Sequence, residues 1–232
     1  MLPVAILAGG LATRIRPISE SIPKSLIIIN QKPFLEWQLQ LLEKNGCETV
    51  VICVSHKSEM IEKFIYDRAK SNLEIYISHD GKKQLGTGGA LIKARKMLGN
   101  AFMVLYGDSY LPVNYEEISE HFLNSSKLSL MVILKNDLNH ERSNVFFENG
   151  YVQKYNKWNP EKSMNFIDFG LSAFKSDAFN NYPLNDFVEL SLIQADLATR
   201  NQMIGFQVYQ RYYEVGSFQG IKDFQNFMEG NL

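Results

Sequence analysis

Short apolar runs alternate with stretches of helical periodicity along the first 135 residues. Residues 3–8 are apolar without alternation, which is typical of a central parallel strand covered on both faces. Similar apolar runs recur at 26–29, 49–54, 73–77, 102–106 and 128–134. Between them, apolar residues spaced three and four apart predict helices around 34–42, 60–65 and 90–98. This alternation predicts an α/β sheet built with right-handed crossover connections.

A different pattern begins after about residue 135. Antiparallel strands are expected where short segments are bounded by turn residues, at 145–148, 151–155 and 165–174. Asn149-Gly150 is a typical hairpin turn between the first two of them. Helical spacing returns from about 187 to 199, and a last helix carries apolar residues at the same spacing: Phe218, Ile221, Phe224 and Phe227.

Length, charge and cysteine content favour one cytoplasmic domain. A chain of 232 residues can bury a sizeable core, and we expect a single domain over 1–232 with halves at 1–135 and 136–232. The net charge of −1 argues against a nucleic acid or an anionic membrane as partner. Cys47 and Cys53 fit neither a zinc site nor a disulfide scaffold. No apolar run approaches the roughly 18 residues of a membrane span.

The most informative chemistry follows the first predicted strand. Gly9 and Gly10 stand where this strand ends, and without Cβ atoms their backbone can turn sharply and bring N–H groups against a phosphate. An isolated glycine pair would more often make only a tight turn. Here Arg14 and Lys24 follow closely, and their planar guanidinium and compact ammonium groups both suit phosphate oxygens. Together these residues predict a triphosphate site.

A second glycine-rich segment, LGTGGAL at 85–91, opens a predicted helix. Its bare backbone would let a flat ligand or a phosphate approach the helix N-terminus, although loop flexibility alone would explain it equally well. The chain contains neither the P-loop pattern nor the dinucleotide pattern G-x-G-x-x-G. A hydride-transfer enzyme is therefore disfavoured.

Two acidic residues are candidates for a metal site. Asp108 follows Gly107 directly after an apolar strand. This position would place its carboxylate beside the predicted triphosphate site. Mg²⁺ needs only one or two carboxylates together with phosphate oxygens and water. Glu214, next to Gly216 in the segment YEVGS, is the strongest candidate for a second ligand.

In their order along the chain, LAGG-x-x-TR-x-RP, PKSL, LGTGGAL, GDS and YEVGS resemble the motifs of the sugar-phosphate nucleotidyltransferases, also called NDP-sugar pyrophosphorylases. The resemblance spans nearly the whole chain. It implies a three-layer α/β/α, Rossmann-like mixed sheet with a small antiparallel sugar-binding lobe. It also implies Mg²⁺-dependent transfer of a nucleotidyl group from a nucleoside triphosphate to a sugar 1-phosphate, with release of pyrophosphate.

The resemblance implies a role for each matched residue. Arg14 would grip the β- and γ-phosphates, Lys24 would lie at the α-phosphate, and Asp108 and Glu214 would hold the metal. The nucleotide would lie against seven further residues: Leu7, Gly9, Gly10, Asp80 and Gln84, with Gly86 and Thr87 beside the base. The sugar phosphate would be bound by Lys157, and the sugar hydroxyls would face Asn144, Asp168 and Gly170. The first 135 residues would then be the nucleotide-binding half and the remainder the sugar-phosphate-binding half.

Three positions depart from the family pattern. Ala12 stands where a glycine is frequent, Ser25 replaces a frequent proline, and Glu214 is one methylene longer than the usual aspartate. The last departure bears on the metal geometry and thus on the role of Glu214.

Several alternatives stay open at the level of sequence. The compact length and the LGTGG segment are similar to those of guanylyltransferases for heptose or mannose 1-phosphate. Asp80 could accept hydrogen bonds from guanine. Uridylyl or cytidylyl transfer is nearly as well supported. An NDP-sugar-using glycosyltransferase commonly has an Asp-x-Asp pair, whereas here Ser109-Tyr110 follows Asp108. A non-catalytic nucleotide sensor would need only the first half, and the formation of a homo-oligomer is left open.

Overall fold

A nine-stranded mixed sheet runs through the protein, as seen in a computed structural model that describes residues 1–10, 22–69, 71–137 and 142–230. The strands are β1 (Val4–Leu7), β2 (Ile28–Ile29), β3 (Lys32–Pro33), β4 (Thr49–Val54), β5 (Glu74–His79), β6 (Ala101–Tyr106), β7 (Ser109–Tyr110), β8 (Ser129–Lys135), β9 (Val145–Glu148), β10 (Tyr151–Tyr155), β11 (Phe166–Lys175), β12 (Met203–Val208) and β13 (Tyr213–Glu214). The helices are α2 (Phe34–Lys44), α3 (Ser58–Asp67), α4 (Gly86–Leu98), α5 (Tyr115–Leu123), α6 (Leu190–Thr199) and α7 (Phe218–Glu229), with 3₁₀ turns η2 (Lys24–Leu26) and η3 (Ser176–Phe179).

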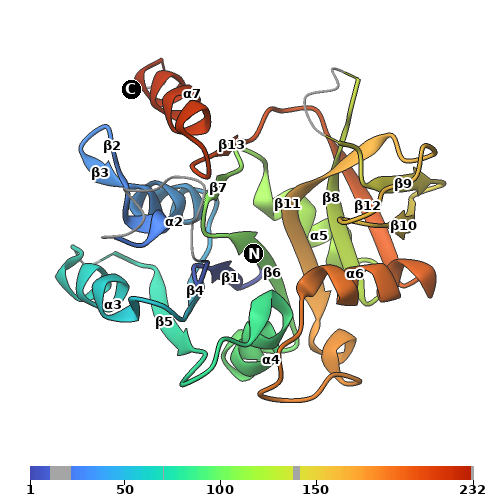
Figure 1. The fold of residues 1–232 in the computed structure, drawn as a ribbon, viewed down its shortest axis with the longest axis horizontal. Coiled ribbons are helices and arrows are strands. Elements are labelled where there is room, and N and C mark those ends of the chain that lie inside the picture. Colours follow the sequence, from blue (N-terminus) through green and yellow to red (C-terminus); the bar gives the residue numbers. More distant parts are fainter. Residues whose placement is uncertain (11–21, 70, 138–141, 231–232) are drawn as a thin grey trace.

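The strand order in the main sheet is β5-β4-β1-β6-β11-β8-β12-β10-β9. Strands β5, β4, β1 and β6 are parallel, so their carboxyl ends lie along one edge. Strand β11 pairs antiparallel with both β6 and β8, whereas β12 runs parallel to β8. The antiparallel strands expected in the second half therefore continue the same sheet, and β9 and β10 form its far end (Figure 1).

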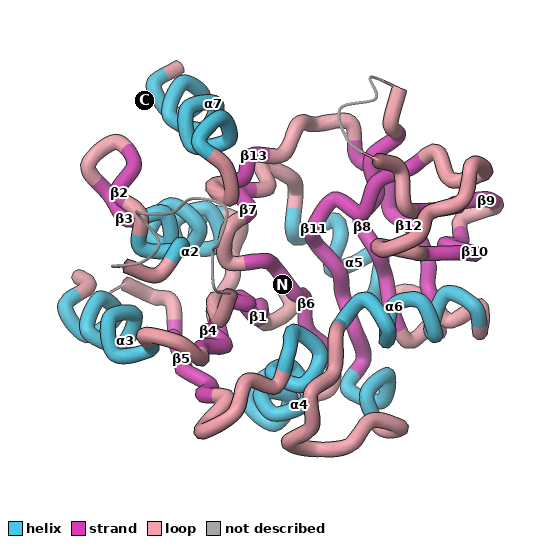
Figure 2. Tube along the Cα trace, viewed as in Figure 1, coloured by secondary structure: helices cyan, strands magenta, loops and turns pink. Residues whose placement is uncertain are grey.

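Helices cover both faces of this sheet, which gives the three-layer α/β/α arrangement. One face packs against α2, α3 and α5, through residues such as Leu35, Ile61 and Phe122. The other face packs against α4 and α6, through Leu91 and Ile193. Figure 1 shows α6 in front of the strands and α5 behind them, and Figure 2 shows the strands gathered between helices. None of the helices in the described part of the chain is both long enough and apolar enough to cross a membrane.

Most sequence-based elements agree with the structure, but the expected strand at 26–29 is wrong. These residues form the end of the η2 turn and the two-residue strand β2, which pairs with β3 in a separate hairpin. Asn30 and Gln31 both have positive φ, at 46° and 67°, and reverse the chain immediately after β2. Ile27 and Ile29 belong instead to a third small core that includes Phe224 of α7, whereas Leu26 joins the core of the main sheet and Ile28 is exposed.

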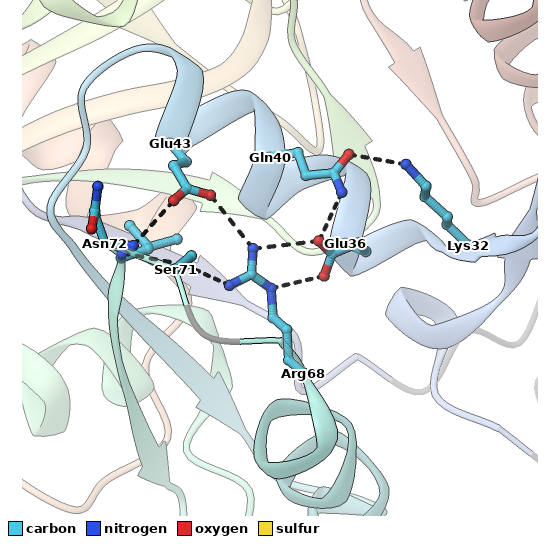
Figure 3. Close-up of polar contacts among 8 residues, drawn as sticks. Lys32, Glu36, Gln40, Glu43, Arg68, Ser71 and Asn72 are labelled. Atoms are coloured by element: carbon cyan, nitrogen blue, oxygen red, sulfur yellow. Dashed lines mark hydrogen bonds and ion pairs between the residues drawn. The ribbon is translucent and has the colours of Figure 1, made fainter.

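An ion-pair network ties the end of α3 to α2 on the same side of the sheet. Arg68 Nε lies 2.8 Å from Glu36 Oε2, and its guanidinium also reaches Glu43 at 3.6 Å and donates to Ser71 Oγ at 2.8 Å (Figure 3). The Arg68 side chain is only 9% exposed. This network thus joins Arg68, directly after α3, and Ser71, which precedes β5, to α2.

Candidate active site

A cavity of about 370 Å³ lies at the carboxyl ends of the parallel strands. Its wall includes Leu7, Gly9 and Gly10 after β1, Lys24 from η2, and Asp108 after β6. Asp80, after β5, lines the same cavity. Strands β5 and β6 are three strand spacings apart, or about 14 Å, and the cavity extends from the end of one to the end of the other. The structure thus brings together residues that the sequence placed in separate motifs.

The ends of β1 and β6 approach closely because residue 107 is a glycine. The Gly107 amide donates to Leu7 O at 3.0 Å, and a Cβ at Gly107 would lie 2.8 Å from that oxygen and 2.9 Å from Ala8 Cα. Both contacts are with backbone, so no side chain can be accommodated without moving a strand. Gly107 thereby fixes Asp108 beside the turn that contains Gly9.

Lys24 and Asp108 form an ion pair inside the cavity, with Lys24 Nζ 2.8 Å from Asp108 Oδ2. Their side chains are 19% and 35% exposed, so both are available to a ligand. The Asp108 carbonyl accepts from Val215 N at 2.9 Å, which anchors the residue to the segment after β13. This pair places a positive and a negative group where phosphates and a cation would meet. Arg14, the other predicted phosphate ligand, lies outside the described residues.

Glu214 lies next to this pair, although its carboxylate is turned toward the start of α7. It accepts hydrogen bonds from Gly216 N and from Ser217 Oγ, the side chain that caps α7. A Cβ at Gly216 would touch the Glu214 carboxylate and would lie 2.9 Å from Lys24 Nζ and 3.6 Å from Asp108 Oδ2. The two carboxylates and the lysine therefore surround a single glycine, Gly216.

The other end of the cavity carries the residues predicted beside the base. Asp80, Gln84, Gly86 and Thr87 all line it. Asp80 Oδ2 accepts from Leu85 N at 3.1 Å, and among the residues that the structure describes no hydrogen bond to Oδ1 is seen. Burial raises the pKa of the Asp80 carboxyl above its ordinary value, against the opposing effects of the Leu85 amide and Lys93.

The segment before α6 closes this end of the cavity by docking on the start of α4. Thr87 Oγ1 donates to Glu189 Oε2 at 2.9 Å and accepts from Leu190 N at 2.8 Å. The amides of Gly88 and Gly89 both donate to Val188 O, at 2.8 and 3.1 Å. The hydroxyl of Thr87 thus holds Glu189 in the cavity wall. Positions 88 and 89 need glycine because the segment before α6 lies directly on the helix and leaves no room for a Cβ.

We expect Gly89→Ala to loosen this docking. The new Cβ would lie 2.6 Å from Asp186 O and 2.9 Å from Leu85 Cβ. Overpacking of this kind costs about 1–3 kcal/mol in free energy of unfolding, measurable by urea denaturation. Gly230→Ala is the matched control, since its Cβ would meet only Asn226 O at 3.7 Å and Phe227 O at 3.8 Å. Equal stability of the two variants would contradict the docking account.

The residues predicted to face a sugar also come together, one strand away from Asp108. Asp168 Oδ2 accepts from Tyr155 Oη at 3.1 Å, and Asp168 Oδ1 accepts from Gly170 N at 3.0 Å. Asn144 Oδ1 accepts from Asp168 N at 2.9 Å. Burial is the largest influence on the Asp168 carboxyl and raises its pKa, while these two donors and Lys157 act in the opposite direction. The hydrogen bonds fix the orientation of Asp168.

Tyr106, the last residue of β6, connects the two groups. Its ring lines the cavity, lies 5.8 Å from Lys157 Nζ and would meet a Cβ at Gly170 at 3.7 Å. Burial, together with the charges of Asp168, Asp108 and Glu189, raises its pKa. Sequence reasoning missed both Tyr106 and Glu189. Tyr106 could have been found from its place directly before Gly107-Asp108, whereas no sequence signal marks Glu189.

Comparison with known proteins decides the family. The family model described as "Nucleotidyl transferase" matches residues 4–219. A D-glycero-alpha-D-manno-heptose 1-phosphate guanylyltransferase of Campylobacter jejuni is 33% identical over 182 residues, which cover 78% of this chain and 79% of the relative. The chain belongs to the sugar-phosphate nucleotidyltransferase family. It is accordingly an enzyme, and the resemblance seen in the motifs is confirmed.

Two further comparisons agree with this membership. The enzyme is 29% identical over 218 residues to a mannose-1-phosphate guanylyltransferase catalytic subunit beta of Xenopus tropicalis, covering 91% of this chain and 60% of the relative. Its fold is similar to that of HddC from Yersinia pseudotuberculosis complexed with GMP-PN, with a TM-score of 0.83, 23% identity, and coverage of 98% of this chain and 100% of the other. The predicted α/β/α fold class is therefore also confirmed.

Proposed function

We propose that the enzyme transfers a guanylyl group from GTP to a heptose or mannose 1-phosphate and releases pyrophosphate. The observation that carries the proposal is that one cavity contains both the Lys24–Asp108 pair, at one end, and Asp80 and Gln84, at the other. The names of the two relatives support guanylyl transfer. Asp80 Oδ1 would accept from the N–H groups of guanine, with Gln84 beside it, while Leu7, Gly9, Gly10, Gly86 and Thr87 would line the nucleotide.

The chain's own residues would act mainly by placing two anions together. A phosphate oxygen of the sugar 1-phosphate attacks the α-phosphorus, the bond to the β-phosphate oxygen breaks, and pyrophosphate leaves. Lys24 would offset charge at the α-phosphate, Arg14 would hold the departing phosphates, and Lys157 would hold the sugar phosphate. Positioning of this kind supplies about 7–11 kcal/mol of a barrier, and preorganised charge adds several more. No general base is needed, because the attacking oxygen is already ionised.

Asp108 and Glu214 are the residues that would hold Mg²⁺. They fit the ion in type and place, since both supply carboxylate oxygens around Gly216 and next to Lys24. The described residues contain no group of three acidic, histidine or cysteine side chains that could hold a metal by themselves. A magnesium site completed by substrate phosphates requires fewer protein ligands than that. When bound, Mg²⁺ would neutralise phosphate charge and orient the α-phosphate for in-line attack.

Asp168→Asn is expected to weaken sugar-phosphate binding without loss of stability. Loss of a charged acceptor for a sugar hydroxyl should raise the KM for the sugar 1-phosphate about tenfold and leave the KM for the nucleotide unchanged. Because the folded-state pKa of Asp168 is raised, its ionised form opposes folding above that pKa. The variant should therefore be as stable as the parent or more so at pH 7.5.

The stability advantage of Asp168→Asn should shrink as the pH falls through the raised pKa toward the ordinary value of 3.8. Urea unfolding of the parent and variant at several pH values measures it. Asp67→Asn, at an exposed site at the end of α3, is the control for the substitution itself. A nucleotide KM that rises as much as the sugar-phosphate KM would contradict the placement of Asp168.

A substrate matrix tests the proposed function. Purified enzyme with Mg²⁺ is given GTP, UTP, CTP or dTTP against mannose, heptose and glucose 1-phosphates, and pyrophosphate release is measured. We expect the highest kcat/KM with GTP and a mannose-type sugar. A preference for UTP or CTP would overturn the base assignment alone. Absence of pyrophosphate with every pair, combined with hydrolysis or transfer of an NDP-sugar, would overturn nucleotidyl transfer itself.

A further inference from the structure

Ser25 has a buried hydroxyl group that nothing in the described part of the chain satisfies. The residue is 2% exposed, and its Oγ has no hydrogen-bond partner. Leaving a buried hydroxyl without a partner is costly, so such groups usually mark a place where a water, an ion or a ligand binds. Ser25 also lines the cavity that contains Lys24 and Asp108. The residue therefore borders the space that a bound substrate would occupy.

The backbone around Ser25 is fixed by hydrogen bonds on both sides. Leu26 N donates to Pro23 O at 2.9 Å, and Ile27 N donates to Lys24 O at 3.2 Å, which closes the η2 turn. Phe34 N then donates to Ile27 O at 2.9 Å and ties the turn to the start of α2. Pro23 has its φ restricted by its ring. The backbone that carries the Ser25 side chain is thus in place before any ligand arrives.

Other buried polar atoms without a partner do not share this location. Ser191 Oγ on α6, Tyr115 Oη on α5 and Gln194 Oε1 on α6 are likewise unpaired and buried. None of these three residues lines the cavity that holds Lys24. Among the unpaired buried groups in the described residues, Ser25 is distinguished by its place on the wall of the substrate cavity, next in sequence to the lysine proposed at the α-phosphate.

We propose that Ser25 Oγ donates a hydrogen bond to a phosphate oxygen of the bound nucleoside triphosphate. This inference rests on the proposed function, and it adds to the phosphate site a residue to which the motif resemblance gives no role. The hydroxyl carries no charge. It would add a directional hydrogen bond to the electrostatic attraction that Lys24 supplies. A hydrogen bond to a charged phosphate is stronger than one between neutral groups. Binding of the triphosphate would supply the partner that residues 1–10, 22–69, 71–137 and 142–230 do not offer.

The test compares Ser25→Ala with the matched variant Ser191→Ala, which removes another buried, unpaired hydroxyl from a residue that does not line the cavity. Dissociation constants for GTP, GMP and guanosine are measured with Mg²⁺ by calorimetry, and melting temperatures are measured with and without GTP. Ser25→Cys is a second variant, because its thiol has a similar shape and is only a weak donor.

We expect Ser25→Ala to raise the Kd for GTP roughly tenfold and to leave the affinity for guanosine unchanged. The melting temperature of the free variant should equal or exceed that of the parent, since no hydrogen bond within the protein is lost. The stabilisation by GTP should be smaller, Ser25→Cys should behave similarly, and Ser191→Ala should bind GTP like the parent.

Three results would overturn the inference, and each is distinct. Equal GTP affinity in the parent, Ser25→Ala and Ser191→Ala would show that the hydroxyl does not contact the nucleotide, while leaving the proposed function intact. An equal loss of affinity for GTP and guanosine would place the contact on the nucleoside instead. Failure of the parent to bind any triphosphate tested would overturn the proposed function together with this contact.

Discussion

Asp108→Asn is expected to lower kcat by roughly 10²–10³-fold while the protein remains folded. The substitution keeps the size of the side chain but removes its negative charge, which we place at the metal and against Lys24 Nζ at 2.8 Å. The Asp108 carbonyl would still accept from Val215 N, so the backbone position is preserved. Initial rates of pyrophosphate release at saturating substrates give kcat, and circular dichroism reports the fold.

A charge-matched control separates this effect from the loss of any carboxylate. Asp67→Asn changes the same chemical group on the exposed end of α3 and should retain the parent turnover. The Asp108 variant should also need a higher Mg²⁺ concentration for half-maximal rate. Parent-like turnover with an unchanged Mg²⁺ requirement would show that Asp108 neither binds the metal nor acts in the reaction.

Lys24→Met should lower kcat/KM by roughly 10²–10³-fold, with a large part of the loss in kcat. Methionine keeps much of the length and apolar stem of lysine but lacks the ammonium group that would face the α-phosphate. The Lys24–Asp108 pair is partly exposed, so its loss should reduce the free energy of unfolding by about 1 kcal/mol or less. Steady-state kinetics and urea unfolding measure the two effects separately.

Lys96→Met is the control for Lys24, because Lys96 is an exposed lysine on α4 that lies outside the cavity. It should keep the parent kinetics. If Lys24→Met changed only the KM for the nucleotide and left kcat unaltered, Lys24 would contribute to ground-state binding and not to the stabilisation of the transition state.

The local pattern of apolar and turn residues was sufficient to predict several strands and turns correctly. The apolar run at 49–54 coincides with β4, and the Asn149-Gly150 turn joins β9 to β10 as expected, with φ of 52° and 83°. The prediction of a main-sheet strand at 26–29 was wrong because apolar side chains can be buried equally well in a turn and a short hairpin that pack on α7. Strand β12 was not predicted, and its place between β8 and β10 follows from pairing with strands distant in the sequence.

The candidate site was predicted as a set of motifs but not as a set of contacts. Lys24 and Asp108 are 84 positions apart, and their ion pair joins the η2 turn to the residue pair that follows β6, a contact that no local pattern predicts. Glu189 was missed because it enters the cavity only through the docking of its segment on Thr87. The replacement of a frequent proline by Ser25 was visible in the sequence, but its unpaired hydroxyl was not.

The central claim is that Lys24 and Asp108 mark the point where the nucleotide and the sugar phosphate meet. A crystal structure with Mg²⁺, a non-hydrolysable GTP analogue and mannose 1-phosphate tests it most directly. We predict Lys24 Nζ within hydrogen-bonding distance of the α-phosphate, and an Asp108 oxygen bound to a cation that also contacts that phosphate. A nucleotide bound elsewhere, with the Lys24–Asp108 pair unchanged and touching no phosphate, would contradict the account.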